Sequence, residues 1–193
     1  MPATLRMFCT QLLAGVLLLA ATACTTKTAM QSPPALTLTI IPTSYANRFS
    51  PEPTISFGEP NHFHVLLTNT SSTPVNIFEE WNSWGYYGLS FEITYSDGRK
   101  DHPMKKVRGW QHNYPSTITI APHGFCMFEV DFGTEWDDSI RAGHKAKDGI
   151  KCRMRAIYTI EPTDKSLRNM VIGPTPVWSG TVSSEESAYT VWP

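Results

Sequence analysis

The chain has 193 residues and a formal net charge of −1, so its length suits one ordinary domain and its charge gives no reason to expect a nucleic-acid partner. Aromatic residues make up 11% of the sequence, which supplies a core and excludes a chain disordered throughout. The short basic stretch of Lys105, Lys106 and Arg108 is expected to lie on a solvated strand face or turn.

The N-terminus has the pattern of a cleavable export signal. Arg6 forms a basic start, residues 7–20 are apolar, and small residues precede Cys24. The apolar run is shorter than the roughly 20 residues that a membrane helix needs, which predicts a signal peptide over residues 1–23 that is removed on export. We therefore expect the mature protein in the bacterial cell envelope.

The segment around Cys24 resembles a bacterial lipobox, in which the cysteine thiol receives diacylglycerol. The resemblance implies a lipid anchor at Cys24, and the non-acidic Thr25 after it favours the outer membrane. Ala21 stands where the lipobox prefers Leu, and residues 21–23 also fit the ordinary signal peptidase. A soluble secreted or periplasmic protein is therefore the alternative.

The mature chain is expected to consist of a flexible tether and one domain. Residues 24–35 are rich in Thr, Ser and Pro, which is typical of a tether, and the domain covers residues 36–193. Alternation of apolar and polar residues indicates strands over 36–40, 63–67, 75–77, 87–95, 118–120, 126–132, 150–158 and 177–182, with a short tail at 189–192. This pattern predicts an all-β fold, an immunoglobulin-like antiparallel β-sandwich of seven to eight strands.

Two polar segments lie between predicted strands, and two cysteines lie within the strands themselves. Residues 137–148 and 162–170 are expected to be exposed loops, each with at most a helical turn. Cys126 and Cys152 each share a strand face with apolar residues, so both thiols should point into the core. An oxidising compartment favours a disulfide between them, and two buried, unreactive thiols are the alternative.

Three stretches, EWNSWGYY at 80–87, RGW at 108–110 and VWSG at 177–180, together resemble an uncharacterised group of secreted bacterial immunoglobulin-like lipoproteins. The order of elements, with an Asn-Thr-Ser turn after the second strand and a Pro-x-Gly turn before a core strand, is also similar to the intracellular proteinase inhibitor family of bacilli. The first resemblance implies an exported immunoglobulin-like domain. The second makes proteinase inhibition an alternative function, with one exposed loop entering a protease cleft.

Aromatic residues are concentrated in two loop-like stretches. A recognition surface for an envelope protein or a glycan is predicted at Trp81, Trp84, Tyr86, Trp110 and His112. Rigid rings with polar neighbours suit such contacts at low entropic cost. The alternative is that the indoles close one end of the core.

His62 and His64 stand two residues apart, a spacing that puts two imidazoles on one face of a strand. They are weak candidate ligands for copper or zinc, and exposed histidines are the simpler interpretation. No catalytic motif is present, and Glu79 and Glu80 are adjacent and would point to opposite faces. The sequence thus favours a lipid-anchored, non-catalytic binding or structural module without a cofactor, with proteinase inhibition and periplasmic metal binding as alternatives.

Overall fold

Side chains that alternate between buried and exposed positions define most of the strands. β3 (Phe63–Asn69) and β5 (Leu89–Tyr95) bury every second residue, and β9 (Ile150–Ile160) does so from Cys152 onward. This period of two is what a strand with one face on the core requires. The computed structural model describes residues 35–46, 48, 51–56, 62–133, 135–137, 149–161 and 176–192.

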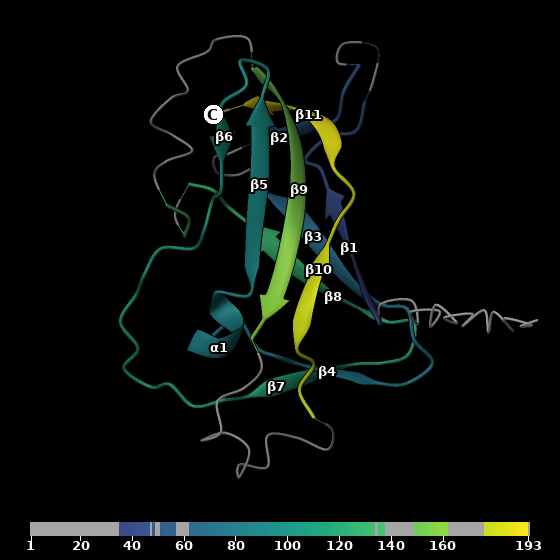
Figure 1. Ribbon diagram of the computed structural model, residues 1–193, viewed down its shortest axis with the longest axis vertical. Helices are drawn as coiled ribbons and strands as arrows, with labels where there is room; N and C mark the ends of the chain where they lie inside the picture. The colour runs from purple at the N-terminus through teal and green to yellow at the C-terminus, as the bar shows by residue number, and fades with distance from the viewer. Residues whose placement is uncertain are drawn as a thin grey trace, which may run out of the picture. The chain divides into compact units, whose positions relative to one another are not determined.

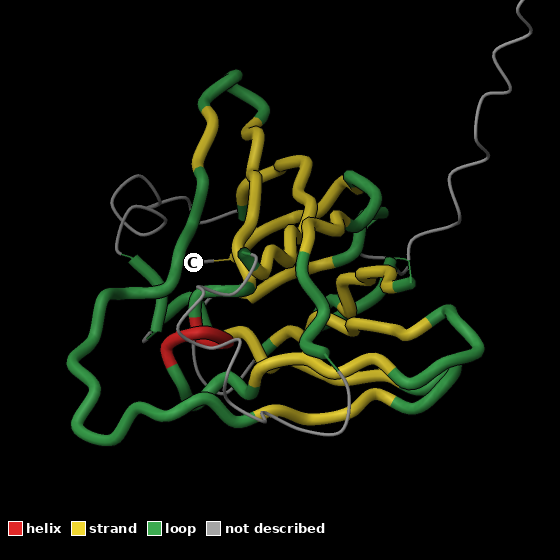
Figure 2. Tube along the Cα trace, turned by 60° about the horizontal axis from the view of Figure 1, so that its bottom comes forward, coloured by secondary structure: helices red, strands yellow, loops and turns green. Residues whose placement is uncertain are grey.

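The described chain is mostly β, as the sequence predicts, with one short helix (Figure 2). The other elements are β1 (Leu36–Ile41), β2 (Thr54–Ser56), β4 (Val75–Phe78), α1 (Ser83–Tyr86), β6 (Lys100–Asp101), β7 (Thr117–Ile120), β8 (Phe125–Val130), β10 (Gly180–Ser183) and β11 (Ser187–Trp192). These are eleven strands where seven to eight were expected. Strands as short as β2 and β6 have no room for an alternating pattern, so periodicity misses them.

The strands form three sheets (Figure 1). One has the order β1-β3-β8, the second has the order β2-β11-β9-β5-β6 with β10 also paired to β9, and the third pairs β4 with β7. The pairs are antiparallel apart from β2 and β11, which run parallel. The all-β prediction is therefore confirmed at the level of several antiparallel sheets.

Aromatic side chains join the inner faces of the two larger sheets. Phe63 of β3 meets Phe91 of β5 with ring centroids 5.7 Å apart, and Phe128 of β8 stacks on Tyr158 of β9 at 5.6 Å. Trp136, which the sequence analysis did not single out, is 1% exposed and packs against Phe91. The core therefore lies between the β1-β3-β8 sheet and the β5-β9 part of the larger sheet.

Backbone hydrogen bonds show which groups of β8 face its neighbour β3. The Asn69 N–H donates to the Gly124 carbonyl at 2.9 Å, and the same register continues with Leu67 opposite Cys126. In an antiparallel pair, directly opposite residues alternate between bonded and non-bonded pairs. The even-numbered residues of β8 therefore bond to β3, and the backbone groups of its odd-numbered residues point away from β3.

Several sequence predictions lie outside the described residues. Residues 1–34 contain the predicted signal, the lipid site Cys24 and nearly all of the predicted tether, and residues 138–148 and 162–170 belong to the two predicted loops. No helix in the described part of the chain is long and apolar enough to cross a membrane. The described residues belong to one unit, Pro33–Pro193, in which β1 begins at Leu36.

Candidate functional site

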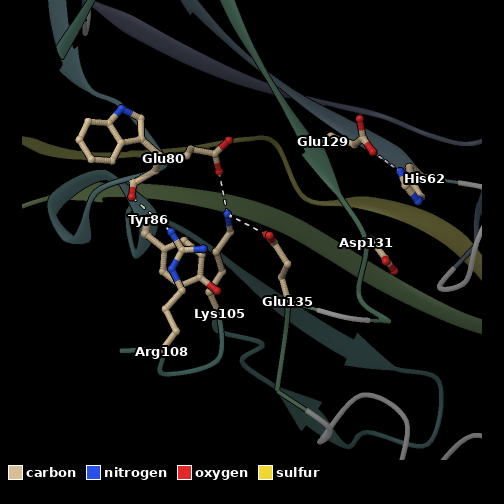
Figure 3. A pocket seen from close by; sticks show the side chains of 9 residues that line it. His62, Glu80, Tyr86, Lys105, Arg108, Glu129, Asp131 and Glu135 are labelled. Atoms are coloured by element: carbon tan, nitrogen blue, oxygen red, sulfur yellow. Dashed lines mark hydrogen bonds and ion pairs between the residues drawn. The ribbon is translucent and has the colours of Figure 1, made fainter. Parts of the chain in front are cut away.

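A cavity of about 440 Å³ lies at the end of β8 (Figure 3). Charged and aromatic side chains from segments far apart in the sequence line it: His62, Glu80, Trp81, Tyr86, Lys105, Arg108, Glu129, Asp131 and Glu135. A cavity on which several polar groups and aromatic rings converge is the default candidate for a binding site. We therefore describe this cavity as the candidate site.

The short helix α1 holds the aromatic side of the cavity in place. Asn82 caps it, since its Oδ1 accepts hydrogen bonds from the N–H groups of Trp84 and Gly85 at 3.1 and 3.0 Å, and its Nδ2 donates to the Ser116 carbonyl at 3.0 Å. A Cβ at Gly85 would lie 2.3 Å from the Glu79 carbonyl oxygen, so only glycine fits there. The strand that was expected to begin at residue 87 begins at Leu89 because this turn precedes it.

Lys105 forms the buried centre of the site. Its side chain is 4% exposed, and its Nζ lies 2.7 Å from a carboxylate oxygen of Glu80 and 3.4 Å from one of Glu135. The same ammonium lies 4.6 Å from the centre of the Tyr86 ring. A buried cation needs such partners because water cannot solvate it there. The prediction that Lys105 lies on a solvated face is wrong.

Arg108 covers the aromatic rings from the solvent side. Its guanidinium lies 4.2 Å from the centre of the Tyr86 ring and 4.0 Å from that of Trp110, and its Nη2 donates to the Trp81 carbonyl at 3.2 Å. These are cation–π contacts, in which the negative face of a ring attracts a cation. The aromatic cluster therefore already accepts one guanidinium, supplied by the chain itself.

Negative charge predominates around the cavity. Its lining contains four carboxylates and two permanent cations, with His62 as a third basic group that pairs with Glu129 through its Nδ1. Asp131 accepts a hydrogen bond from the Gly133 N–H at 2.6 Å. Burial, followed by the charge of Glu135, raises the pKa of Tyr86, so its hydroxyl stays protonated at neutral pH.

The structure brings together part of the predicted recognition surface. Trp81 and Tyr86 line the cavity, and Trp110 reaches it through an edge-to-face contact with Tyr86 at 5.4 Å. Trp84 instead packs against Phe78 and borders a second cavity of about 630 Å³.

His112 and Trp81 are both exposed, but only Trp81 lies at the cavity. His112 is exposed and does not line the candidate site. Trp81 remains 38% exposed, with its Nε1 donating to Glu79 at 2.9 Å and its ring against Tyr114. The single exposed indole at the rim of the cavity is therefore that of Trp81.

Most of the charged residues of the site could not be recognised from the sequence. Lys105 and its partners Glu80 and Glu135 come from three separate loops, and no spacing rule links them. Glu129 carried one usable signal, since it alternates outward on a strand whose even-numbered neighbours are apolar. Its neighbour across the sheet could not be inferred without the strand order.

Cys126 and Cys152 are free thiols in the structure, which agrees with the alternative of two separate thiols rather than with a disulfide. They lie in different sheets, Cys126 opposite Leu67 and Cys152 opposite Tyr95. Burial, and then the charge of Glu80, raise the pKa of Cys126 to about 11. Burial, and then Glu52, raise that of Cys152 to about 12. Such thiols are poor nucleophiles at neutral pH.

The two histidines named as metal ligands occupy different settings. His62 pairs with Glu129, whereas His64 lies half-buried on β3 opposite Glu129 in the strand register. Within the described residues, no three or more His, Cys, Asp or Glu side chains are grouped closely enough to hold a metal ion. Metal binding therefore stays a prediction without a completed ligand set.

Comparison with known proteins finds no family model that matches the chain, no similar curated protein and no matching solved structure. The resemblances to secreted immunoglobulin-like lipoproteins and to the proteinase inhibitors of bacilli therefore stay predictions.

Proposed function

We propose that this chain is a non-catalytic binding module of the bacterial cell envelope that recognises a cationic group on its partner. The observation that carries the proposal is the acidic cavity beside an exposed indole. The lining offers an entering guanidinium or ammonium both the exposed Trp81 ring and the Glu129 and Asp131 carboxylates. Both kinds of contact are attractive for a cation.

The way Arg108 packs supports this choice of ligand. Its guanidinium already lies over Tyr86 and Trp110, so the aromatic cluster is shaped for a flat cation. The four carboxylates of the lining outnumber the two permanent cations, Lys105 and Arg108, and His62 adds a third positive charge only when protonated, so the cavity keeps an acidic excess. An anionic ligand would meet repulsion there, and a neutral glycan would gain less.

The proposal includes the fold and the address that the sequence predicts. Two facing sheets with an aromatic core support an immunoglobulin-like sandwich, a fold that commonly presents binding loops at one end. A lipid anchor at Cys24, joined to β1 by a tether, would hold such a module at the outer membrane. Mass spectrometry of the mature protein tests the anchor, and an unmodified Cys24 or a retained signal would contradict it.

Titration with two matched small probes tests the recognition. Acetyl-arginine amide should shift the indole N–H resonance of Trp81, whereas acetyl-citrulline amide, which has the same shape without the charge, should not. Trp81→Ala should weaken binding about threefold to tenfold, the size of a cation–π contact. Trp192→Ala is the control, because Trp192 is 41% exposed on β11 and does not line the cavity.

Equal responses to both probes, or no response to either, would overturn the proposal. The two alternatives keep separate tests. A panel of secreted proteases that retains full activity excludes inhibition. Calorimetry with copper and zinc that gives no heat of binding excludes a metal site at His62 and His64.

A further inference from the structure

The second edge of β8 has backbone groups with no strand partner. Among the described strands, β8 pairs with β3 alone. The N–H and C=O groups of its odd-numbered residues, Phe125, Met127 and Glu129, point away from β3, because the even-numbered residues form the hydrogen-bonded pairs with β3. No hydrogen bond between described residues occupies these groups. They form a row of three donors and three acceptors at the sheet edge.

This edge has few of the features with which proteins commonly block strand addition. Proline and charged side chains, lysine above all, are the usual protection, and β8 carries one such residue, Glu129, at its far end. Its outward side chains Phe125 and Met127 are 64% and 57% exposed. An apolar, exposed edge strand of six residues is a template for pairing with another extended chain.

The candidate cavity lies at one end of the same edge. Glu129 is the last outward residue of β8, and Asp131 follows it, and both line the cavity. Figure 3 shows Glu129 and His62 to one side and the Glu80, Lys105 and Glu135 cluster to the other.

We propose that an extended polypeptide segment binds by adding as a strand to the free edge of β8, with a basic side chain entering the cavity at the Glu129 end. Main-chain hydrogen bonds to Phe125, Met127 and Glu129 would supply affinity independent of sequence. The acidic cavity would select lysine or arginine at one position. This inference rests on the proposed function and names its partner as a protein rather than a glycan or a small amine.

Charge complementarity favours a basic segment over a second copy of this chain. Two β8 strands paired about a twofold axis at Met127 would match their hydrogen bonds, with Phe125 opposite Glu129. That arrangement brings no further cation to the acidic cavity. A basic peptide uses both the edge and the cavity, so we assign the edge to a peptide and make self-pairing an outcome of the test.

The first experiment asks whether the peptide backbone takes part. The probe is acetyl-(Thr-Arg)₃-amide, titrated by calorimetry against the folded domain. Two variants carry N-methyl groups on the Thr amides or on the Arg amides. In an extended chain these two sets of N–H groups point to opposite edges. We expect one methylated peptide to bind at least about tenfold more weakly and the other to bind like the parent, because strand addition uses one edge of the peptide.

The second experiment removes the edge on the protein side. Met127→Pro deletes an outward N–H and blocks pairing, whereas Met127→Ser removes the same side chain and keeps the N–H. Proline is tolerated on an edge strand when its nitrogen faces solvent, and equal urea midpoints for the two variants would confirm that both fold. The Pro variant should bind the parent peptide about tenfold more weakly than the Ser variant.

The outcomes separate this inference from the proposed function. If both methylated peptides bind like the parent, or if the Pro and Ser variants bind equally, strand addition is overturned, while binding of acetyl-arginine amide would leave the cavity proposal standing. If neither the amide nor the peptide binds, both proposals fail. If the peptide does not bind and Met127→Pro converts a dimer to a monomer in sedimentation, a second copy occupies the edge and the peptide assignment is overturned.

Discussion

β8 and β9 face each other across the core, yet their solvent sides are opposite in character. The outward side chains at the start of β9 are basic, and each has an acidic partner on a neighbouring segment: Lys151 with Glu52, Arg153 with Glu186 and Arg155 with Glu92. β9 also has strand partners on both sides, β5 and β11. The charged side chains on its outer face are therefore paired within the chain and need no further partner.

The outward side of β8 has apolar side chains where that of β9 has paired charges. Phe125 and Met127 are exposed and lie opposite Thr68 and Leu66 of β3. Glu129 is the one outward charge on the strand. Among the described residues, paired charges thus lie on an interior strand while the edge strand presents apolar side chains, which is the reverse of what protection against aggregation requires.

Alanine substitutions on adjacent residues of β8 should separate its two faces most strongly. Phe128 is 2% exposed and stacks on Tyr158, so Phe128→Ala should cost about 3–5 kcal/mol of unfolding free energy. Met127→Ala should change it by less than about 0.5 kcal/mol. Urea unfolding measures both. A comparable loss for Met127→Ala would mean that its side chain is packed in solution and that the edge is covered.

The two free cysteines provide matched probes on the inner faces of the two strands. The pKa is about 11 for Cys126 and about 12 for Cys152, and Cys126 is the more exposed. Because the Cys126 thiol is the more accessible of the two, a thiol reagent should modify it several-fold faster than Cys152.

Labelling is carried out at about pH 8, and mass spectrometry of the labelled peptides shows which cysteine is modified first. Cys126→Ser and Cys152→Ser identify each labelling phase. Faster modification of Cys152 would reverse the comparison and indicate that the larger sheet opens first. Absence of both free thiols before labelling would contradict the structure at these positions.

The strands were predictable because burial of one face produces an alternation of apolar and polar residues over a short stretch of sequence. Leu36, Leu38 and Ile40 alternate within six residues, and the structure buries all three. The turn after Tyr95 was also readable, since Gly98 adopts the positive φ that its Asp-Gly pair predicts.

Only those residues of the site that stand close together in the sequence were predictable. Trp81 and Tyr86 stand in one short stretch, and their aromatic chemistry indicated recognition before the fold was known. Lys105 gave no such signal, because a lysine is buried only when distant carboxylates meet it, and Glu80 and Glu135 come from other parts of the chain. The pairing of two cysteines likewise depends on which sheet each strand joins.

A charge placed on the free edge should sharpen the contrast between the two faces. Met127→Lys adds a lysine to the exposed edge of β8, the device with which other proteins block pairing. Concentration-dependent association and aggregation on mild heating should decrease, with the urea midpoint unchanged. Ala188→Lys is the control, because Ala188 is exposed on β11, which has partners on both sides. If both variants reduce association equally, net charge and not the edge is responsible.

The smallest effect is expected on the charged face, at the ion pair of Arg153 with Glu186. The hydrogen bond from Arg153 lowers the pKa of Glu186 below its ordinary value. A carboxyl group whose pKa is lowered by folding adds stability above its unfolded pKa and loses it as the pH falls through the folded value. Wild type should therefore exceed Glu186→Gln in stability at neutral pH, and the two should converge in acid. Because the pair is exposed, high salt should also shrink the gap. A gap that persists in acid would show that the glutamate contributes by packing, and the outer face of β9 would then resemble that of β8 more than its charges indicate.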